Sequence, residues 1–95
     1  MDVKPSFIGG EVELLKFLNN NSTFKFIKKT KGKNFVSLNV VVSKEGKVYN
    51  PKVLVSTADG LEEEIIRLIS LTIWQPGIRK GKEVNVIRNI LVSIE

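Results

Sequence analysis

The sequence predicts a small α+β domain of two layers, in which a three-stranded antiparallel sheet carries two helices on one face. Apolar and polar residues alternate over 35–42 and again over 84–94, as is typical of half-buried strands. Two other segments place apolar residues three and four apart, which indicates amphipathic helices. The predicted elements follow in the order helix, strand, strand, helix, strand, and the hairpin between the first two strands favours an antiparallel sheet.

The first helix is predicted over 11–18, directly after Gly9-Gly10. Glu11 and Glu13 lie near the positive end of its dipole. A run of three asparagines and a serine, 19–22, should end the helix, because asparagine tolerates the left-handed conformation and competes for backbone hydrogen bonds. The apolar face would consist of Val12, Leu14, Leu15 and Leu18.

A β-hairpin is predicted over 35–55. Gly46 lies in the turn 44–47 and supplies the positive φ that a bulged hairpin loop needs. Pro51 lies inside the second strand, 48–55, and has no N–H to donate, so this strand should lie at a sheet edge. The buried face of the first strand would consist of Val36, Leu38, Val40 and Val42.

The second helix should begin after Asp59, an N-cap residue with Glu62 in the capping-box position. The acidic run 62–64 would complement the helix dipole rather than bind metal. The buried stripe would consist of Leu61, Ile65, Leu68, Ile69 and Thr72, with the helix ending near Ile73 because Pro76 cannot continue it. Four residues are predicted to have structural roles in the turns that follow, with the tryptophan as a core anchor: Trp74, Pro76, Gly77 and Gly81.

The last strand is predicted over 84–94 and has apolar residues on both faces, since Ile87 and Leu91 interrupt its polar side. If the second helix crosses over the first strand, the strand order is second, first, third. The last strand would then lie at the other sheet edge, and a long apolar edge invites pairing with another chain, including a second copy of this one.

Composition limits the class of protein. A chain of 95 residues makes a single domain, 1–95, and 42% hydrophobic with 26% charged residues is typical of a folded one. Without cysteine or histidine it has no disulfides, thiolate nucleophiles or histidine-based triads. Acid–base chemistry would depend on Asp, Glu, Lys or Tyr49, and no pairing among them is visible. We therefore expect no enzymatic activity, no cofactor and no metal site.

The net charge of +5 serves solubility and also favours anionic partners such as nucleic acid, phospholipid head groups or acidic polymers. No stretch reaches the roughly 18 apolar residues of a membrane span, and the first residues lack the apolar centre of a signal peptide. These features suit either a cytoplasmic protein or a domain separated from its export segment.

Two motifs carry a family resemblance. Pro5-Ser6-Phe7-Ile8-Gly9-Gly10 precedes the first helix, and Trp74-Gln75-Pro76-Gly77 is followed four residues later by Gly81. With the hairpin around Gly46 between them, these motifs make nearly the whole chain similar to the carboxy-terminal domain of the TonB energy transducers. Either motif alone would be a weak signal; the two at their expected separation are more specific.

The resemblance implies a periplasmic domain, tethered by a helix outside this chain to the inner membrane and its proton-channel proteins. It implies binding of the TonB box, a short peptide of outer-membrane transporters, as an added strand, and transmission of force for nutrient uptake. Backbone hydrogen bonds would provide the affinity. The contacting residues would be Val84, Asn85, Val86, Ile87, Arg88, Asn89, Ile90, Leu91 and Val92, with an accessory contact from Phe24, Lys25, Lys28 and Lys29.

Two other functions remain open. Phe24-Lys25 stands where the family usually has Tyr-Pro near the transporter contact, which favours a periplasmic module of the same fold that serves another envelope or sensing system. A less favoured alternative is nucleic-acid binding, for which lysines would track phosphates and phenylalanines would stack on bases. In the periplasm the same lysines would contact cell-wall polymer or lipid. The cluster consists of Lys25, Lys28, Lys29, Lys31 and Lys33, interleaved with Phe24, Phe26 and Phe35.

Overall fold

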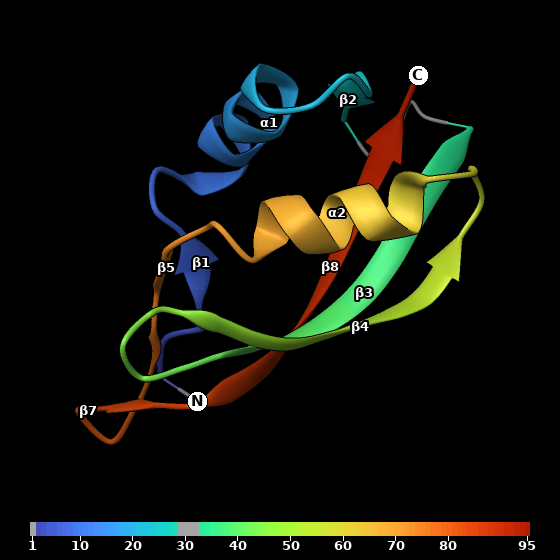
Figure 1. Cartoon of the computed structure of the whole chain (residues 1–95). Helices are drawn as coiled ribbons and strands as arrows, with labels where there is room; N and C mark the ends of the chain where they lie inside the picture. The colour runs from blue at the N-terminus through green and yellow to red at the C-terminus, as the bar shows by residue number, and fades with distance from the viewer. Residues whose placement is uncertain (1, 29–32) are drawn as a thin grey trace.

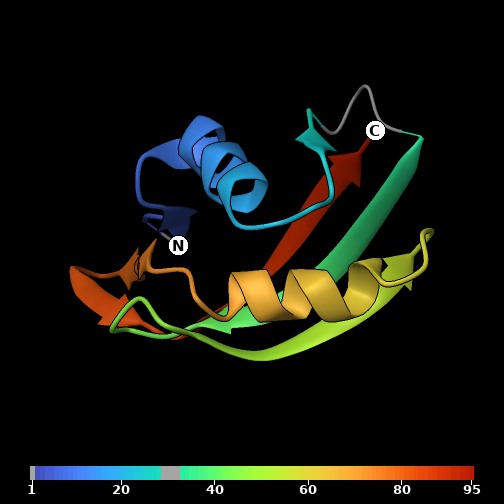
Figure 2. The ribbon, with the colours of Figure 1, turned by 45° about the horizontal axis from the view of Figure 1, so that its top comes forward.

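The computed structural model describes residues 2–28 and 33–95, and it confirms a small α+β domain with two helices. Over these residues the main sheet is antiparallel and has four strands in the order β2-β8-β3-β4, so the expectation of three strands is wrong (Figure 1). The strands are β2 (Phe26–Ile27), β3 (Asn34–Val42), β4 (Val48–Ser56) and β8 (Val86–Ile94). Helices α1 (Gly10–Asn20) and α2 (Leu61–Ile69) lie on the same side of the sheet (Figure 2).

The additional strand, β2, is held by the end of α1. The Asn19 side chain accepts a hydrogen bond from the Phe26 N–H (2.7 Å) and donates one to the Phe26 carbonyl (3.1 Å). The Phe26 ring is buried in the core, and β2 pairs with Ser93 and Ile94 of β8. A strand of two residues has no alternation to detect, which is why the sequence pattern does not predict it.

The hairpin of β3 and β4 is as predicted. The residues of β3 expected inside are buried, Gly46 has φ 84°, and β4 forms the opposite edge of the sheet. A Cβ at Gly46 would collide with the Trp74 carbonyl, because the hairpin tip lies against that residue and the Trp74 N–H donates to the Gly46 carbonyl (2.8 Å). Glycine is therefore required at this position for space as well as for φ.

The first helix differs from its prediction at one buried position and at its end. Val12 is 64% exposed, so it does not belong to the apolar face, whereas Leu14 and Leu18 are buried. The helix ends where expected but not through a left-handed residue, since Asn21 has φ −120°. Instead the Asn21 side-chain amide donates to the Phe17 carbonyl (2.8 Å) and satisfies a free carbonyl of the last turn.

The second helix begins and ends differently from the prediction. Its N-cap is Gly60, in the left-handed conformation with φ 78°, and no side chain caps it, so the predicted cap at Asp59 is wrong. The three glutamates do lie in its first turn. The helix ends at Ile69, before the predicted Ile73, because the N–H groups of Leu71 and Thr72 bond three residues back and tighten the chain.

Short strands connect the amino-terminal segment to the segment that follows α2. Strand β1 (Ser6–Phe7) pairs with β5 (Trp74–Gln75), and Val3 exchanges two hydrogen bonds with Ile78 (2.9 and 3.0 Å). Strands β6 (Gly77–Arg79) and β7 (Lys82–Val84) form a hairpin. Positive φ at both Lys80 and Gly81 identifies its two-residue turn as the type that matches strand twist.

These strands correct three sequence predictions. Gly81 lies in a turn as expected, but Gly77 lies in β6 and has no positive φ, so its assignment as a turn glycine is wrong. Pro76 separates β5 from β6 rather than ending α2, which ends earlier. Val84 belongs to β7, so the last strand begins at Val86.

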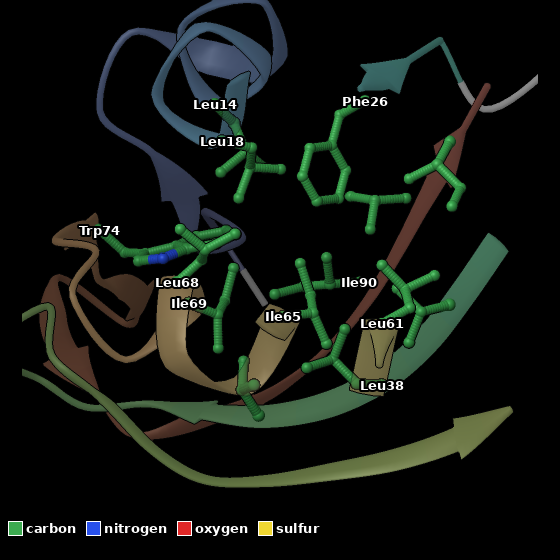
Figure 3. Close-up of a cluster of buried hydrophobic side chains, with 14 of the residues drawn as sticks. Leu14, Leu18, Phe26, Leu38, Leu61, Ile65, Leu68, Ile69, Trp74 and Ile90 are labelled. Carbon is green, nitrogen blue, oxygen red and sulfur yellow. The ribbon is translucent and has the colours of Figure 1, made fainter. Parts of the chain in front are cut away.

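The core lies between the helices and the helix-facing side of β3 and β8 (Figure 3). Trp74 is 4% exposed, which confirms its prediction as a core residue. Its indole N–H donates to the Thr72 hydroxyl (2.8 Å), and its ring meets Phe7 edge-on at 5.8 Å between centroids. The main contributors to the core are Leu14, Leu18, Phe26, Leu38, Leu61, Ile65, Leu68, Ile69, Trp74 and Ile90.

Candidate functional site

Strand β8 has one fully paired side and one largely open side. It pairs with β3 at every residue from Val86 to Ile94 without a register shift. On its other side, among the residues the structure describes, only Ser93 and Ile94 are paired, with β2. Residues 86–92 therefore present an unpaired strand edge, called here the open edge.

The direction of the backbone groups follows from alternation along an antiparallel strand. The Phe35 N–H and carbonyl both bond to Thr57, next to β4, so the even-numbered residues of β3 face β8. The Glu95 N–H donates to the Lys25 carbonyl, on the β2 side (3.0 Å). The register then directs the N–H and C=O groups of Ile87, Asn89 and Leu91 away from β3, towards the open edge.

Three hollows that share lining residues run beside the open edge, and together they are called the edge groove. The first, about 420 Å³, is lined by Lys4, Pro5, Val86, Ile87, Arg88 and Asn89. The second, about 340 Å³, is lined by Ser6, Phe7, Gly10, Glu11, Leu14 and Trp74 together with 88–91 of β8. The third, about 50 Å³, extends past Leu15 to Ile27 and Val92. An added strand would thus have room for the side chains on its helix-facing side.

The walls of the edge groove come from distant parts of the chain. The pairing of β1 with β5 places Phe7 against Trp74, and the Val3–Ile78 bridge holds the segment before β1. The first turns of α1 add Glu11 and Leu14. None of these wall residues was predicted to belong to the site, because no periodic pattern indicates that residues 3–7 pair with 74–78.

Arg88 is the one charged residue of β8. It pairs with the buried Val40, so its side chain projects on the helix-facing side of the sheet, into the groove. Its Nε is buried and has no hydrogen-bond partner among the described residues. A buried polar nitrogen without a partner loses its hydration without compensation, which makes it available to an acceptor from outside.

The structure brings most of the predicted contact residues together, but not all. Val86 to Val92 share the open edge, whereas Val84 pairs with Gly77 in the β6–β7 hairpin. Asn85 lies between the strands, and its side-chain oxygen accepts a hydrogen bond from the Lys44 N–H (2.8 Å). Asn85 therefore connects the β3–β4 turn to the start of β8, and the edge begins one residue later.

The predicted accessory contact lies beside the β2 end of β8. Phe24 packs against the core, with its ring centroid 6.5 Å from that of Phe26. The Lys25 ammonium is 3.1 Å from the Glu95 carboxylate. Lys28 is exposed, and Lys29, like Lys31 of the basic cluster, lies outside the described residues. Phe26 is in the core, so its ring is not available for stacking.

No helix within residues 2–28 and 33–95 is long and apolar enough to cross a membrane. Over the same ranges no three His, Cys, Asp or Glu side chains gather in a way that could hold a metal ion. In comparisons with known proteins, no family model, no curated protein and no solved structure matches this chain.

Proposed function

We propose that this domain binds an extended peptide as an additional strand on β8, as the periplasmic carboxy-terminal domain of a TonB-like energy transducer. The observation that carries the proposal is the open edge, which has no register shift over residues 86–92 and has the edge groove beside it. The motif resemblance suggests the partner, the TonB box of an outer-membrane transporter. It also suggests a tether to the inner membrane and its proton-channel proteins.

The chemistry of the open edge suits capture of a peptide with few sequence requirements. Ile87, Asn89 and Leu91 each offer one N–H and one C=O, and a typical hydrogen bond contributes about 0.5–1.5 kcal/mol net. A pull along the strands loads these bonds in shear, so several must break together. The arrangement is therefore suited to transmitting force from an inner-membrane motor to a transporter.

A second candidate is a periplasmic module of the same fold that binds a peptide from another envelope or sensing system. The observation that favours it is the segment where the family usually has Tyr-Pro near the transporter. Here Phe24 packs on the core and Lys25 is paired with Glu95. The two candidates share the open edge and differ in the peptide that occupies it.

Amide NMR shifts of the ¹⁵N-labelled domain, titrated with TonB-box peptides from its own organism, test the proposal. We expect saturable shifts concentrated in 86–92 and slower amide exchange at Ile87, Asn89 and Leu91. If transporter peptides leave these amides unchanged and another envelope peptide shifts them, the second candidate is correct. If no extended peptide shifts them in a folded sample, strand addition at this edge is wrong.

N-methylated peptides provide the matched control. A peptide strand turns alternate N–H groups towards the domain, so methylation of one set should abolish binding and methylation of the other set should not. Sedimentation of the free domain over the same concentration range measures pairing of two copies through the open edge, which would compete with the peptide. Equal binding by both methylated peptides would show that the contact is not made through backbone hydrogen bonds.

A further inference from the structure

We infer that the strand added to β8 carries a carboxylate beside Arg88 and Lys4, and an apolar side chain two residues away that fills the groove against Phe7, Leu14 and Trp74. This inference rests on the proposed strand addition and specifies which peptides the edge selects. It arises from three features of the edge groove: an unpaired guanidinium nitrogen, an uneven distribution of charge, and the spacing of side chains along a strand.

The first feature is Arg88. Its Nε is buried without a hydrogen-bond partner among the described residues, although it lines a groove open to a ligand. Hydrogen bonds between a guanidinium and a carboxylate are charge-assisted and stronger than neutral ones. An inward-facing charge on an edge strand also discourages indiscriminate pairing. Arg88 would therefore admit a strand that brings an acceptor and disfavour one that buries an apolar group there.

The second feature is the charge along the groove. The hollow at the start of β8 is lined by Lys4 and Arg88 and by no acidic residue. The next hollow shares Arg88 but adds Glu11, together with apolar walls from Phe7, Leu14, Trp74 and Ile90. A carboxylate is attracted to the first hollow, which holds two cations, more than to the second, where Glu11 offsets the charge of Arg88. The aromatic and aliphatic walls of the second hollow suit an apolar side chain.

The third feature is spacing. Side chains on one face of a strand recur every second residue, about 6.5–7 Å apart. Arg88 and Ile90 are separated by this interval on β8; Arg88 lines both hollows, whereas Ile90 lines only the apolar one. The two recognised peptide side chains must therefore be residues i and i+2, and their order fixes the direction in which the peptide lies.

A double-mutant cycle with the full 95-residue chain tests the inference. The probes are capped peptides of about nine residues, built from serine and threonine with a glutamate and a valine two positions apart. They are made in both orders, each with a partner in which glutamine replaces the glutamate. Dissociation constants come from the amide shifts of 86–92. We expect the peptide with one order of glutamate and valine to bind more tightly than the other. Replacing its glutamate with glutamine should raise the dissociation constant about tenfold.

Arg88→Gln should remove the difference between the glutamate and glutamine peptides, because it removes the guanidinium that distinguishes them. Arg79→Gln is the matched control: it removes the same charge from an exposed residue of β6 that does not line the groove, and it should preserve the difference. Arg88→Lys keeps the charge without the Nε donor and should give an intermediate preference. Circular dichroism checks that each variant folds. If Arg88→Gln does not fold, Arg88→Lys tests the role of the guanidinium in its place.

Failure of this inference differs from failure of the proposed function. If both peptides shift 86–92 with equal affinity, strand addition stands and selection by Arg88 is wrong. Selection by Arg88 is also wrong if the preference survives in Arg88→Gln or disappears in Arg79→Gln, because net charge would then explain it. If no peptide shifts the open edge of the folded protein, strand addition fails and selection fails with it.

Discussion

The two edges of the main sheet differ in the regularity of their pairing and in the features that protect them from other chains. On β4, Asn50 has φ 51°, Pro51 lacks an N–H, and two register shifts interrupt the pairing with β3. On β8, nine residues pair with β3 without a shift, and Ile87 and Leu91 are 70% and 42% exposed. Bulges, prolines and lysines protect sheet edges from other chains. The β4 edge has all three protections, whereas residues 86–92 of the open edge have no bulge, proline or lysine and carry only the inward-facing charge of Arg88, as expected of an edge that receives a selected partner.

The largest expected effect is a loss of stability, compared between a residue beside the open edge and a residue on β4. Trp74 lies in the core and also walls the edge groove of β8, whereas Leu54, on β4, is about half exposed. Trp74→Ala should lower the free energy of unfolding by about 3–5 kcal/mol. Leu54→Ala should lower it by about 0.5 kcal/mol or less, as for an ordinary surface position. Urea denaturation measures the free energy of unfolding of both variants. Similar losses would show that Trp74, beside the open edge, stabilises the fold no more than an exposed residue of β4.

A proline substitution on each edge gives the next largest expected effect. Ile87→Pro removes an N–H that the register directs to the open edge, and Val53→Pro removes one that points away from β3 on the β4 edge. Neither donor bonds to β3, so both variants should fold. Peptide affinity should fall about tenfold or more in Ile87→Pro and stay unchanged in Val53→Pro. Equal affinity in the folded variants would exclude residue 87 from the docking edge.

The same comparison shows how much the sequence could predict. The β3–β4 hairpin could be predicted from local signals in the sequence: alternation, a turn with Gly46, and Pro51, which indicates an edge strand. The predicted cap at Asp59 failed because Gly60 takes the left-handed conformation and starts the helix one residue later. Local pattern identified which residues form each long element, but not how the backbone conformation ends them.

The groove could not be predicted in this way. Its walls depend on the pairing of Phe7 with Trp74, and β2 depends on two hydrogen bonds between Phe26 and the Asn19 side chain, which donates one and accepts the other. These strands are two residues long and their partners are distant in sequence, so they leave no periodic signal. The interruption at Arg88 in an otherwise apolar face was visible in the sequence. That its Nε is buried without a partner depends on the tertiary structure.

The smallest expected effect concerns the link between the helices. Glu64 of α2 accepts hydrogen bonds from the Arg67 guanidinium and from the Ser22 hydroxyl after α1, each 2.7 Å long. Arg67 also donates to the Asn21 carbonyl (2.8 Å). The link joins α1, which walls the edge groove, to α2, which contacts β4. It therefore couples the supports of the two edges.

The hydrogen bond from Arg67, and secondarily the one from Ser22, lowers the pKa of the Glu64 carboxyl below its ordinary value. A lowered pKa in the folded state gives stability that is fully present above the ordinary carboxyl pKa and is lost as pH falls through the folded value.

Glu64→Gln should abolish this acid-dependent loss. Glu62→Gln, the matched control, removes a charge from the same turn without touching the link and should retain the loss. Thermal unfolding between neutral and acidic pH measures the difference, which should be only a few degrees in Tm because the pair is partly solvated. Identical pH profiles for Glu64→Gln and the unmodified protein would mean that the link does not stabilise the fold, and that the two sides of the sheet are coupled through the core alone.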